Sequence, residues 1–289
     1  MDADLETLCI AVYCTADDLL PVGCPNARRQ LTDAEVVTLC VAQQAMGIPS
    51  DRRFLAAARQ RLGHLFPVLP DQPGFHKRRG QLTETIDWLS AVMAARCPGY
   101  RDDVVLVDST PVECARSVET TRRSALGDVC AYGYSPSHSR FFWGMRLHIC
   151  CALDGTPRQM ILAGADQGER DIARKLLERT LTGGETVVCD KGYAGQDFEA
   201  DIALLGARVV RPTRKNEKRR SDPALAPIRQ RIESCIQTLK DILTLERHGA
   251  RTLAGLRARI GARILTLAAC IWLNHELARP PRSLVAYAT

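Results

Sequence analysis

The sequence predicts an α/β protein in which a small all-α domain, residues 1–99, precedes a mixed five-stranded sheet with flanking helices in residues 100–289. Three observations predict this fold class. Apolar residues recur at helical spacing in the first hundred positions, short β-branched runs begin only after Gly99, and helical segments alternate with such runs from about residue 170 onward. Three successive strands followed by strand–helix alternation are typical of a mixed sheet covered by helices.

The N-terminal domain is expected to contain four short helices, at about residues 5–20, 33–46, 51–65 and 83–96. The second helix has a clear start, because Thr32 can accept a hydrogen bond from the backbone three residues on while Glu35 reaches back. Basic residues stand near the starts of several of these helices. Such a domain is compatible with a DNA-reading module and equally with an ordinary helical bundle.

The sheet is expected to contain five strands, at residues 104–107, 141–152, 159–163, 186–189 and 207–211. The first strand is a continuous run of Val and Leu, as in strands that are buried on both faces. Asp154 and Gly155 separate the second and third strands and predict a hairpin there. Further helices are expected at residues 170–181, 197–205 and 225–246.

Two of these strands end in an aspartate, Asp108 after the first and Asp190 after the fourth. A carboxylate at the end of a buried strand needs compensation, and two that meet at one edge of a sheet repel each other unless a cation lies between them. The alternative is structural, because an aspartate after a strand often caps the next helix or turn.

The last long helix adds a third carboxylate, Glu233. Its apolar residues share one sector at about 100° per residue, and Arg229, Glu233 and Lys240 form a narrow arc beside that sector. We therefore expect these three side chains where the helix meets the sheet. A surface ion pair between Arg229 and Glu233, four residues apart, is the simpler alternative.

The chain has a net charge of +6, and its cations are concentrated in one connection. Between Arg208 and Arg220, Glu217 is the only acidic residue. The basic run consists of Arg208, Arg211, Arg214, Lys215, Lys218, Arg219 and Arg220. Because the run joins two apolar-periodic segments, we expect it to be displayed and to bind the DNA backbone without reading sequence. A solvated loop is the alternative.

Composition argues against several classes of protein. Twelve cysteines without a C-x-x-C pair indicate reduced, mostly buried thiols rather than a zinc site. No apolar run reaches the ~18 residues needed to span a bilayer, and the acidic N-terminus lacks the order of a signal peptide. We therefore expect a cytoplasmic protein with no membrane partner.

Four segments, VVLVDSTPV, FFWGMRLH, VVCDKGYAG and RQRIESCIQTLK, resemble the DDE transposases of bacterial insertion sequences in their order and context. That family's last helix carries Tyr-x2-Arg-x3-Glu-x6-Lys, and this chain keeps the Arg, Glu and Lys but has Ala226 at the tyrosine position. Its second strand has Gly-x-Lys-x-His, where this chain has Arg146 in place of the lysine. The resemblance covers roughly residues 100–250.

The resemblance implies a ribonuclease H-like core in which Asp108, Asp190 and Glu233 hold two Mg²⁺ ions, with Mn²⁺ as a substitute. Asp108 would bridge both ions, and the other two carboxylates would each hold one. It implies an endonuclease and strand transferase that cleaves the terminal inverted repeats of an insertion sequence and joins them to target DNA. A homodimer on DNA, associated with the nucleoid, is the implied assembly.

The resemblance also implies where DNA is contacted. The N-terminal domain would bind the ends of the element. The side chains expected to face DNA phosphates are Arg229, Lys240, Arg146, Lys191, Arg214, Lys215, Arg219 and Arg220. Lys191 is equally explained as a solvated lysine, His148 as a structural histidine, and Trp143 as a core residue rather than a platform for a base.

Two other functions stay open. An aspartate-dependent phosphotransferase would use Asp108 as a nucleophile, but that pattern wants a second aspartate two residues later, where Thr110 stands. A transposase-derived DNA-binding protein without catalysis is disfavoured because all three carboxylates are present. Metal-dependent nicking of DNA that contains the element's end discriminates among the three functions.

Overall fold

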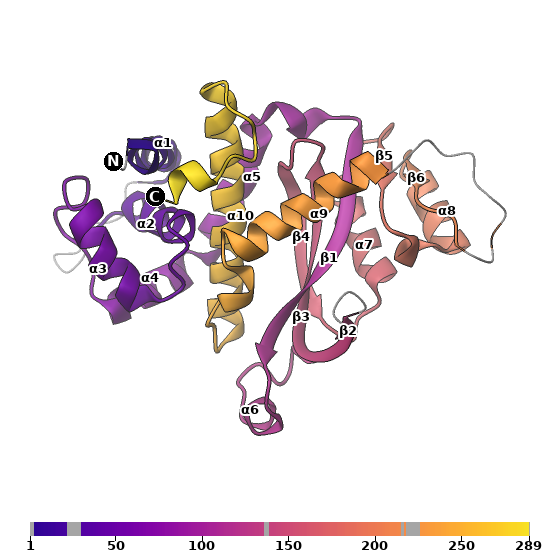
Figure 1. Ribbon diagram of the computed structural model, residues 1–289, viewed down its shortest axis with the longest axis horizontal. Coiled ribbons are helices and arrows are strands. Elements are labelled where there is room, and N and C mark those ends of the chain that lie inside the picture. Colours follow the sequence, from indigo (N-terminus) through magenta and orange to yellow (C-terminus); the bar gives the residue numbers. More distant parts are fainter. Residues whose placement is uncertain (1–2, 22–29, 136–138, 215–216, 218–225, 289) are drawn as a thin grey trace. The chain divides into compact units, whose positions relative to one another are not determined.

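The computed structural model describes residues 3–21, 30–135, 139–214, 217 and 226–288, without the side chains of residues 3, 226, 227 and 229. The chain forms two compact units, one made of Met1–Ala94 with Thr238–Thr289 and the other of Ala95–Gln237; Figure 1 traces its path. The domains predicted from the sequence divide at residue 99, with the C-terminal helices in the sheet domain. In the structure the segment from Thr238 belongs with the N-terminal helices.

The first unit is helical. Its elements are α1 (Ala3–Leu19), α2 (Asp33–Ala45), α3 (Asp51–Arg61), α4 (Gln72–Gln81), α5 (Thr83–Arg96), η4 (Leu245–Arg247), α10 (Leu253–Glu276) and η5 (Val285–Tyr287). α10 is buried over most of its length and packs against α1, α2 and α4, which ties the C-terminal segment to this unit. All four predicted helices are present, and the predicted capping box is formed, with the Glu35 backbone N–H donating to the Thr32 hydroxyl at 3.1 Å.

The sequence analysis does not predict α4, whose ten residues include a proline and two glycines. Asp71 caps the helix by accepting from the Gly74 backbone N–H at 2.8 Å. Only Phe75 and Arg79 of this helix are buried among its described residues, so the apolar periodicity that reveals other helices is missing here.

Arg79 belongs to a buried charge network at the start of α3. Its guanidinium donates to both oxygens of Asp51, at 3.0 and 2.9 Å, and Arg259 of α10 donates to the same carboxylate at 2.9 Å. The Gln43 amide adds a hydrogen bond at 2.9 Å. Burial alone would raise the pKa of Asp51, but the hydrogen bonds and charges of the two arginines lower it to about 2.

The second unit contains a six-stranded mixed sheet, which confirms the predicted fold class with one strand more than expected. The strands are β1 (Val104–Ala115), β2 (Ala131–Ser135), β3 (Arg140–Ala152), β4 (Pro157–Gly164), β5 (Thr186–Val188) and β6 (Arg208–Val210). β1, β3 and β4 are antiparallel, whereas β5 and β6 run parallel to β1. β2, the strand that is not predicted, shares with β4 the edge of β3 that faces away from β1.

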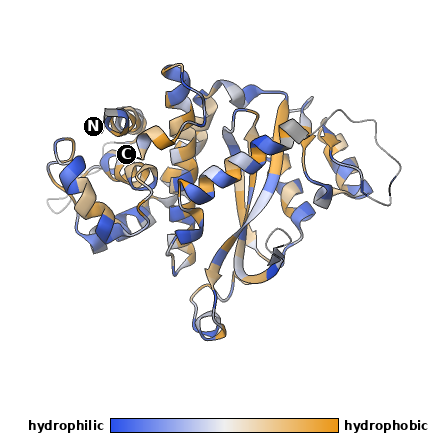
Figure 2. Cartoon of the chain, viewed as in Figure 1, coloured by the Kyte–Doolittle hydropathy of each residue, from blue (hydrophilic) through white to orange (hydrophobic). Residues whose placement is uncertain are grey.

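Helices flank this sheet. They are η1 (Pro98–Arg101), α6 (Val118–Arg122), α7 (Glu169–Glu178), η3 (Lys191–Tyr193), α8 (Gln196–Leu204) and α9 (Ala226–Asp241), the last of which crosses residue 237, where the units divide. The strands are mostly hydrophobic, whereas hydrophobic and hydrophilic residues alternate along α9 (Figure 2). None of the described helices combines the length and apolar character that crossing a membrane requires.

The two faces of β1 meet different helices. Val107 packs into a buried cluster with residues of α7. Cys151 of β3 pairs with Leu106, the residue before Val107, and points to the opposite face of the sheet. Its sulfur lies 3.6 Å from the sulfur of Cys235 on α9. Because side chains alternate along a strand, Asp108 faces α9 and Ser109 faces α7.

Candidate active site

Asp108 lies within β1 rather than at its end, so the prediction that the strand stops there is wrong. β1 continues to Ala115 because β3 extends the antiparallel ladder along it. Its parallel pairing with β5 stops at Leu106, opposite Val188. From Val107 onward this second edge of β1 has no β5 partner, and a pocket of about 790 Å³ lies beside it.

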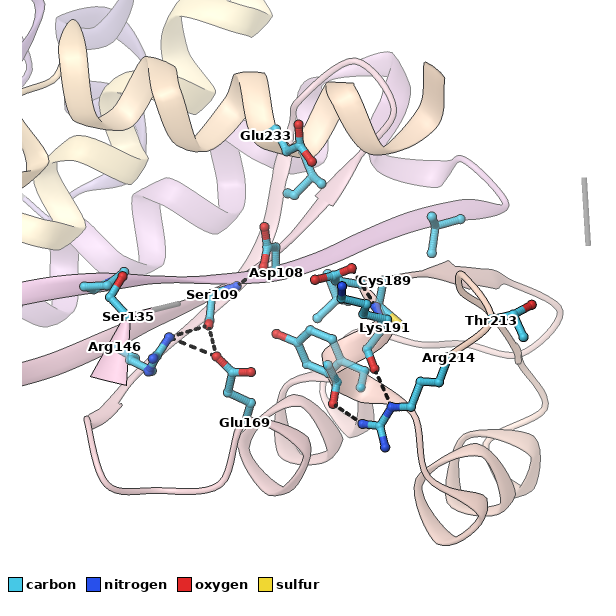
Figure 3. Close-up of a pocket in the computed structure, with 17 residues that line it drawn as sticks. Asp108, Ser109, Ser135, Arg146, Glu169, Cys189, Lys191, Thr213, Arg214 and Glu233 are labelled. Atoms are coloured by element: carbon cyan, nitrogen blue, oxygen red, sulfur yellow. Dashed lines mark hydrogen bonds and ion pairs between the residues drawn. The ribbon is translucent and has the colours of Figure 1, made fainter. Parts of the chain in front are cut away.

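The three predicted carboxylates line this pocket from three elements (Figure 3). Asp108 comes from β1, Asp190 stands just after β5, and Glu233 comes from α9. They line one pocket because β1 and β5 are parallel neighbours and because α9 packs on the face of β1 toward which Asp108 points.

Asp108 has little to balance its charge. Its Oδ1 accepts one hydrogen bond, from the Ser109 backbone N–H at 2.7 Å. Burial, opposed by that hydrogen bond and reinforced by three carboxylates, raises the pKa of Asp108 to about 6. These carboxylates are Glu169, Asp190 and Glu233. A pocket of this kind favours a cation.

Asp190 combines the two roles that the sequence analysis offers as alternatives. Its Oδ1 accepts from the Lys191 backbone N–H at 2.6 Å and caps the short turn η3. The same residue lines the pocket. The cap fixes the direction of the side chain, so a structural role is compatible with a role in the site.

Glu233 is exposed on α9, beside the residues that hold this helix on the sheet. Ile232, Cys235 and Ile236 are buried, so the apolar sector expected for the helix is the packed one. The side chain of Arg229 lies outside the described residues. The alternative, a surface ion pair between Arg229 and Glu233, therefore stays untested.

The donor atoms of the pocket suit a hard divalent cation. Carboxylate oxygens are the ligands that Mg²⁺ prefers, and burial, reinforced by the neighbouring carboxylates, raises the pKa of Asp108. Within the described ranges, no three His, Cys, Asp or Glu side chains are grouped closely enough to hold one ion. The residues therefore fit such an ion by the chemistry of their donor atoms.

The predicted DNA contacts are found in several places. Lys191 and Arg214 line the pocket, and Arg214 donates to the backbone oxygens of Lys191 and Gly192 at 3.1 and 3.4 Å. Lys240 belongs to the other unit, where it pairs with Glu246 at 3.5 Å. Lys215, Arg219, Arg220 and the side chain of Arg229 lie outside the described residues.

Part of the basic run is internal rather than displayed. Arg211 is buried and pairs with Glu199 at 2.7 Å and Glu217 at 2.8 Å. Arg208 is exposed and donates to the Thr186 hydroxyl of the neighbouring strand at 3.0 Å. Sequence patterning alone does not separate Arg211 from the rest of the run, because its acidic partners come from α8 and from within the run.

Glu169, the first residue of α7, lines the pocket and is missed by the sequence analysis. Its Oε1 accepts from Arg146 and from the Ser109 hydroxyl, each at 2.9 Å. Arg146 is buried and also donates to the Tyr134 backbone oxygen at 2.5 Å, so protein groups engage it. The only sequence signal for Glu169 is its place at a helix start, where acidic residues are common.

His148 and Trp143 are buried. Neither ring nitrogen of His148 has a hydrogen-bond partner among the described residues. Burial and then the charge of Arg146 lower the pKa of His148 to about 4, so the ring is neutral at pH 7. The ring is buried as a structural histidine would be, but the hydrogen bonds that such a histidine is expected to make are missing among the described residues. The burial of Trp143 agrees with a core residue.

The sheet unit therefore has three carboxylates lining one pocket beside the open edge of its central strand. A family model described as "Transposase DDE domain" matches residues 99–269. The chain belongs to this family, which confirms the resemblance to DDE transposases. DDE transposases generally use divalent metal ions.

No curated protein matches the chain. One solved structure, a cryo-EM structure of a piggyBac transposase synaptic complex with hairpin DNA, is similar with a TM-score of 0.45 and 10% sequence identity. The match covers 100% of this chain and 76% of that one.

Proposed function

We propose that this transposase serves a bacterial insertion sequence, cleaving DNA at the element's terminal inverted repeats and joining the freed ends to target DNA. The observation that carries the proposal is that Asp108, Asp190 and Glu233, from three separate elements, line one pocket inside the family domain. The strand order, with three antiparallel strands and two parallel to the first, agrees with a ribonuclease H-like core.

Cleavage and joining are the same in-line phosphoryl transfer with different nucleophiles. Two bound Mg²⁺ or Mn²⁺ ions would supply Lewis acidity to the attacking and the leaving oxygen. Asp108 would bridge the two positions, while Asp190 and Glu233 would each hold one. The η3 cap keeps Asp190 directed at the pocket, and Arg214 stabilises the following turn by binding its carbonyl oxygens.

The chemistry leaves a 3′-hydroxyl on the element. A water oxygen forms the new bond to phosphorus, the bond from phosphorus to the 3′ oxygen breaks, and that oxygen gains a proton. The resulting hydroxyl is then the nucleophile for the target strand. Because one pocket serves both steps, any change to its carboxylates is expected to impair cleavage and joining together.

Glu233→Gln tests this function. The substitution keeps size and helix propensity nearly constant, so we expect folding and end binding to survive while cleavage and joining both fall at least about 100-fold. The assay compares gel-shift affinity with Mg²⁺-dependent cleavage of one duplex, taken from the DNA that flanks the coding sequence. Glu178→Gln, on the exposed end of α7, is the matched control.

Three outcomes of this assay are informative. Cleavage by the Glu233 variant within a few-fold of the control would return Glu233 to a surface pair with Arg229. Binding without cleavage by the unmodified protein would indicate a transposase-derived DNA-binding protein. Transfer of phosphate to Asp108, detected by mass spectrometry, would favour an aspartate-dependent phosphotransferase.

We also propose that the basic run binds DNA phosphates. Neutralising Lys215, Arg219 and Arg220 together is expected to lower affinity equally for all sequences and to reduce the salt slope by about 0.9 for each phosphate that the variant no longer neutralises. Neutralising Lys175, Arg179 and Arg122, three exposed cations outside the run, controls for net charge. An unchanged slope would make the run a solvated loop.

The helices of residues 1–99 are proposed to bind the element's ends, with two copies of the chain acting on one pair of ends. Their support is the family membership together with the short, capped helices of the first unit. Mass photometry of the protein with end duplex is expected to show two chains per complex. Complexes with one chain would contradict the homodimer.

A further inference from the structure

The α7 side of the pocket contains a second group of side chains, to which the proposed function assigns nothing. It consists of Ser109, Arg146, Glu169 and Tyr193, which we call the Glu169 cluster. All four line the pocket that holds Asp108. Because Ser109 faces α7 while Asp108 faces α9, the pocket reaches both faces of β1 around its open edge, as Figure 3 shows.

Glu169 is fixed through one of its two carboxylate oxygens. Arg146 and the Ser109 hydroxyl both donate to Oε1, at 2.9 Å each, and Arg146 is itself buried. Among the described residues no donor reaches Oε2. That oxygen lies 3.6 Å from the position that a Cβ on Gly192 would take, next to the turn that follows Asp190. About a third of the side chain is exposed, at 37%.

Tyr193 provides a second and independent observation. The residue is only 2% exposed, lines the pocket, and its hydroxyl has no hydrogen-bond partner of ordinary geometry among the described residues. Burial, and then the charges of Asp108 and Glu169, raise the pKa of Tyr193, so the hydroxyl keeps its proton and can donate. An unsatisfied buried hydroxyl is costly, so a ligand that accepts from it is expected.

A single ligand that reaches both groups would donate to a carboxylate oxygen and accept from a phenol. A phosphate oxygen only accepts, and the Glu169 carboxylate repels it. A bare cation satisfies the carboxylate but not the hydroxyl. A water molecule or an alcohol does both, and these are the two nucleophiles that cleavage and joining need.

We propose that Glu169 holds the attacking hydroxyl beside Asp108, water in cleavage and the DNA 3′-hydroxyl in joining, an inference that rests on the proposed function. Oε2 accepts the hydrogen bond of the attacking O–H group, and Tyr193 donates to the same oxygen. As the new oxygen–phosphorus bond forms and the old one breaks, the attacking hydroxyl gives its proton to Oε2. The leaving oxygen takes a proton from solvent, and Glu169 later returns its own to solvent. Ser109 and Arg146 are positioning residues.

Glu169→Gln tests this assignment. Because two donors bind the Oε1 position, the amide oxygen stays there and the amide NH₂ replaces Oε2, so a donor stands where the acceptor is needed. We expect cleavage to fall at least about 100-fold relative to Glu178→Gln. The affinity for the end duplex is expected to stay close to that of the control. The melting temperature is expected to fall, because the buried Arg146 loses its ion-pair partner, so cleavage is compared well below it.

The choice of nucleophile separates the two roles of Glu169, because a residue that only supports the fold would not change this choice. With Mn²⁺, the end duplex and added glycerol, cleaved ends carry either a free phosphate or a glycerol ester. A residue that touches the attacking hydroxyl sets the ratio of these products. We therefore expect Glu169→Gln to change the ratio at least about threefold.

Tyr193→Phe is the second variant, and the protein is expected to fold because the Ser109 hydroxyl beside this residue keeps its hydrogen bond to Glu169. Cleavage is expected to fall about tenfold with a changed glycerol ratio. If both variants match Glu178→Gln in rate and ratio, the assignment is overturned while the proposed function stands. If the unmodified protein cleaves no end duplex, the proposed function fails and this inference fails with it.

Discussion

Asp51 in the helical unit and Asp108 in the sheet unit are both carboxylates removed from bulk water, and the protein treats them in opposite ways. Asp51 is 5% exposed and receives hydrogen bonds from Arg79, Arg259 and Gln43. Burial is overcome by these partners, and its pKa falls to about 2. Asp108 receives one backbone N–H, and burial with neighbouring carboxylates raises its pKa to about 6.

The difference separates a charge that the fold has neutralised from one that it has not. Around Asp51 the fold supplies two arginines, so the carboxylate is part of the packed interior of its unit. Around Asp108 it supplies three more acidic side chains beside an open strand edge. A carboxylate left unbalanced in a pocket needs a partner from outside the chain, and such groups gather at functional sites.

The largest contrast is expected from Asp108→Asn. Removing this carboxylate should lower Mg²⁺-dependent cleavage by about 10³-fold, since it removes the charge that bridges the proposed ion positions. The free energy of unfolding without metal should not fall, because the ionised aspartate is disfavoured there. Cleavage assays and urea unfolding in EDTA measure the two quantities. An inactive variant that has also lost stability would show that Asp108 supports the fold.

Asp51→Asn should give the opposite result. Breaking a buried pair by removing one partner costs about 3–5 kcal/mol, and here the guanidinium groups of Arg79 and Arg259 would stay buried without their carboxylate. Urea unfolding measures the loss. Cleavage per folded molecule should stay near that of the unmodified protein. A variant that is stable but inactive would instead move Asp51 into the active site.

The sequence alone predicts that Asp108 and Asp190 lie in one site, but it does not predict how far β1 extends. The apolar run before Asp108 and the strand before Asp190 are local patterns, and the two residues do line one pocket. The length of β1 could not be read in the same way. Beyond Asp108 the apolar run is interrupted by Ser, Thr, Pro and Glu, and this stretch is held in the strand by β3, a partner from a distant part of the sequence.

The side chains that surround Asp51 and Asp108 come from distant parts of the sequence, and no local sequence pattern predicts them. Asp51 meets Arg259 across more than two hundred positions, and Glu169 reaches the pocket only because α7 begins beside Ser109 and Arg146. The basic run shows the same limit. Its arginines look alike in sequence, yet Arg211 is buried in ion pairs that depend on where α8 lies.

The pH dependence of stability should distinguish the two carboxylates by its sign. The folded-state pKa of Asp108, about 6, exceeds the ordinary 3.8, so the folded protein binds the extra proton and stability falls as pH rises from about 4 to about 6. Discounted for partial exposure, this amounts to about 2 kcal/mol. Asp108→Asn should abolish this fall, measured by urea unfolding in EDTA between pH 4 and pH 7.

Asp51 should contribute nothing to that window. Its folded-state pKa, about 2, lies below the ordinary 3.8, so its stabilisation is complete above about pH 4 and is lost as pH falls toward 2. The stability difference between Asp51→Asn and the unmodified protein should thus be constant from pH 4 to pH 7. A difference that changes within this window would contradict the assignment of the charge network.

Stabilisation of the folded protein by a divalent ion should be the smallest effect. It tests most directly whether Asp108 lacks a positively charged partner. An ion that binds only the folded state at about ten times its dissociation constant stabilises it by about 1.4 kcal/mol. We expect Mn²⁺ to raise the urea midpoint of the unmodified protein accordingly. Asp51→Asn, although less stable throughout, should show the same increment, because its carboxylate is already balanced by arginine. Asp108→Asn should show almost none, and Glu233→Gln a reduced one. An equal increment in Asp108→Asn would place the ion elsewhere, and the unbalanced charge of this pocket would then need a partner of another kind.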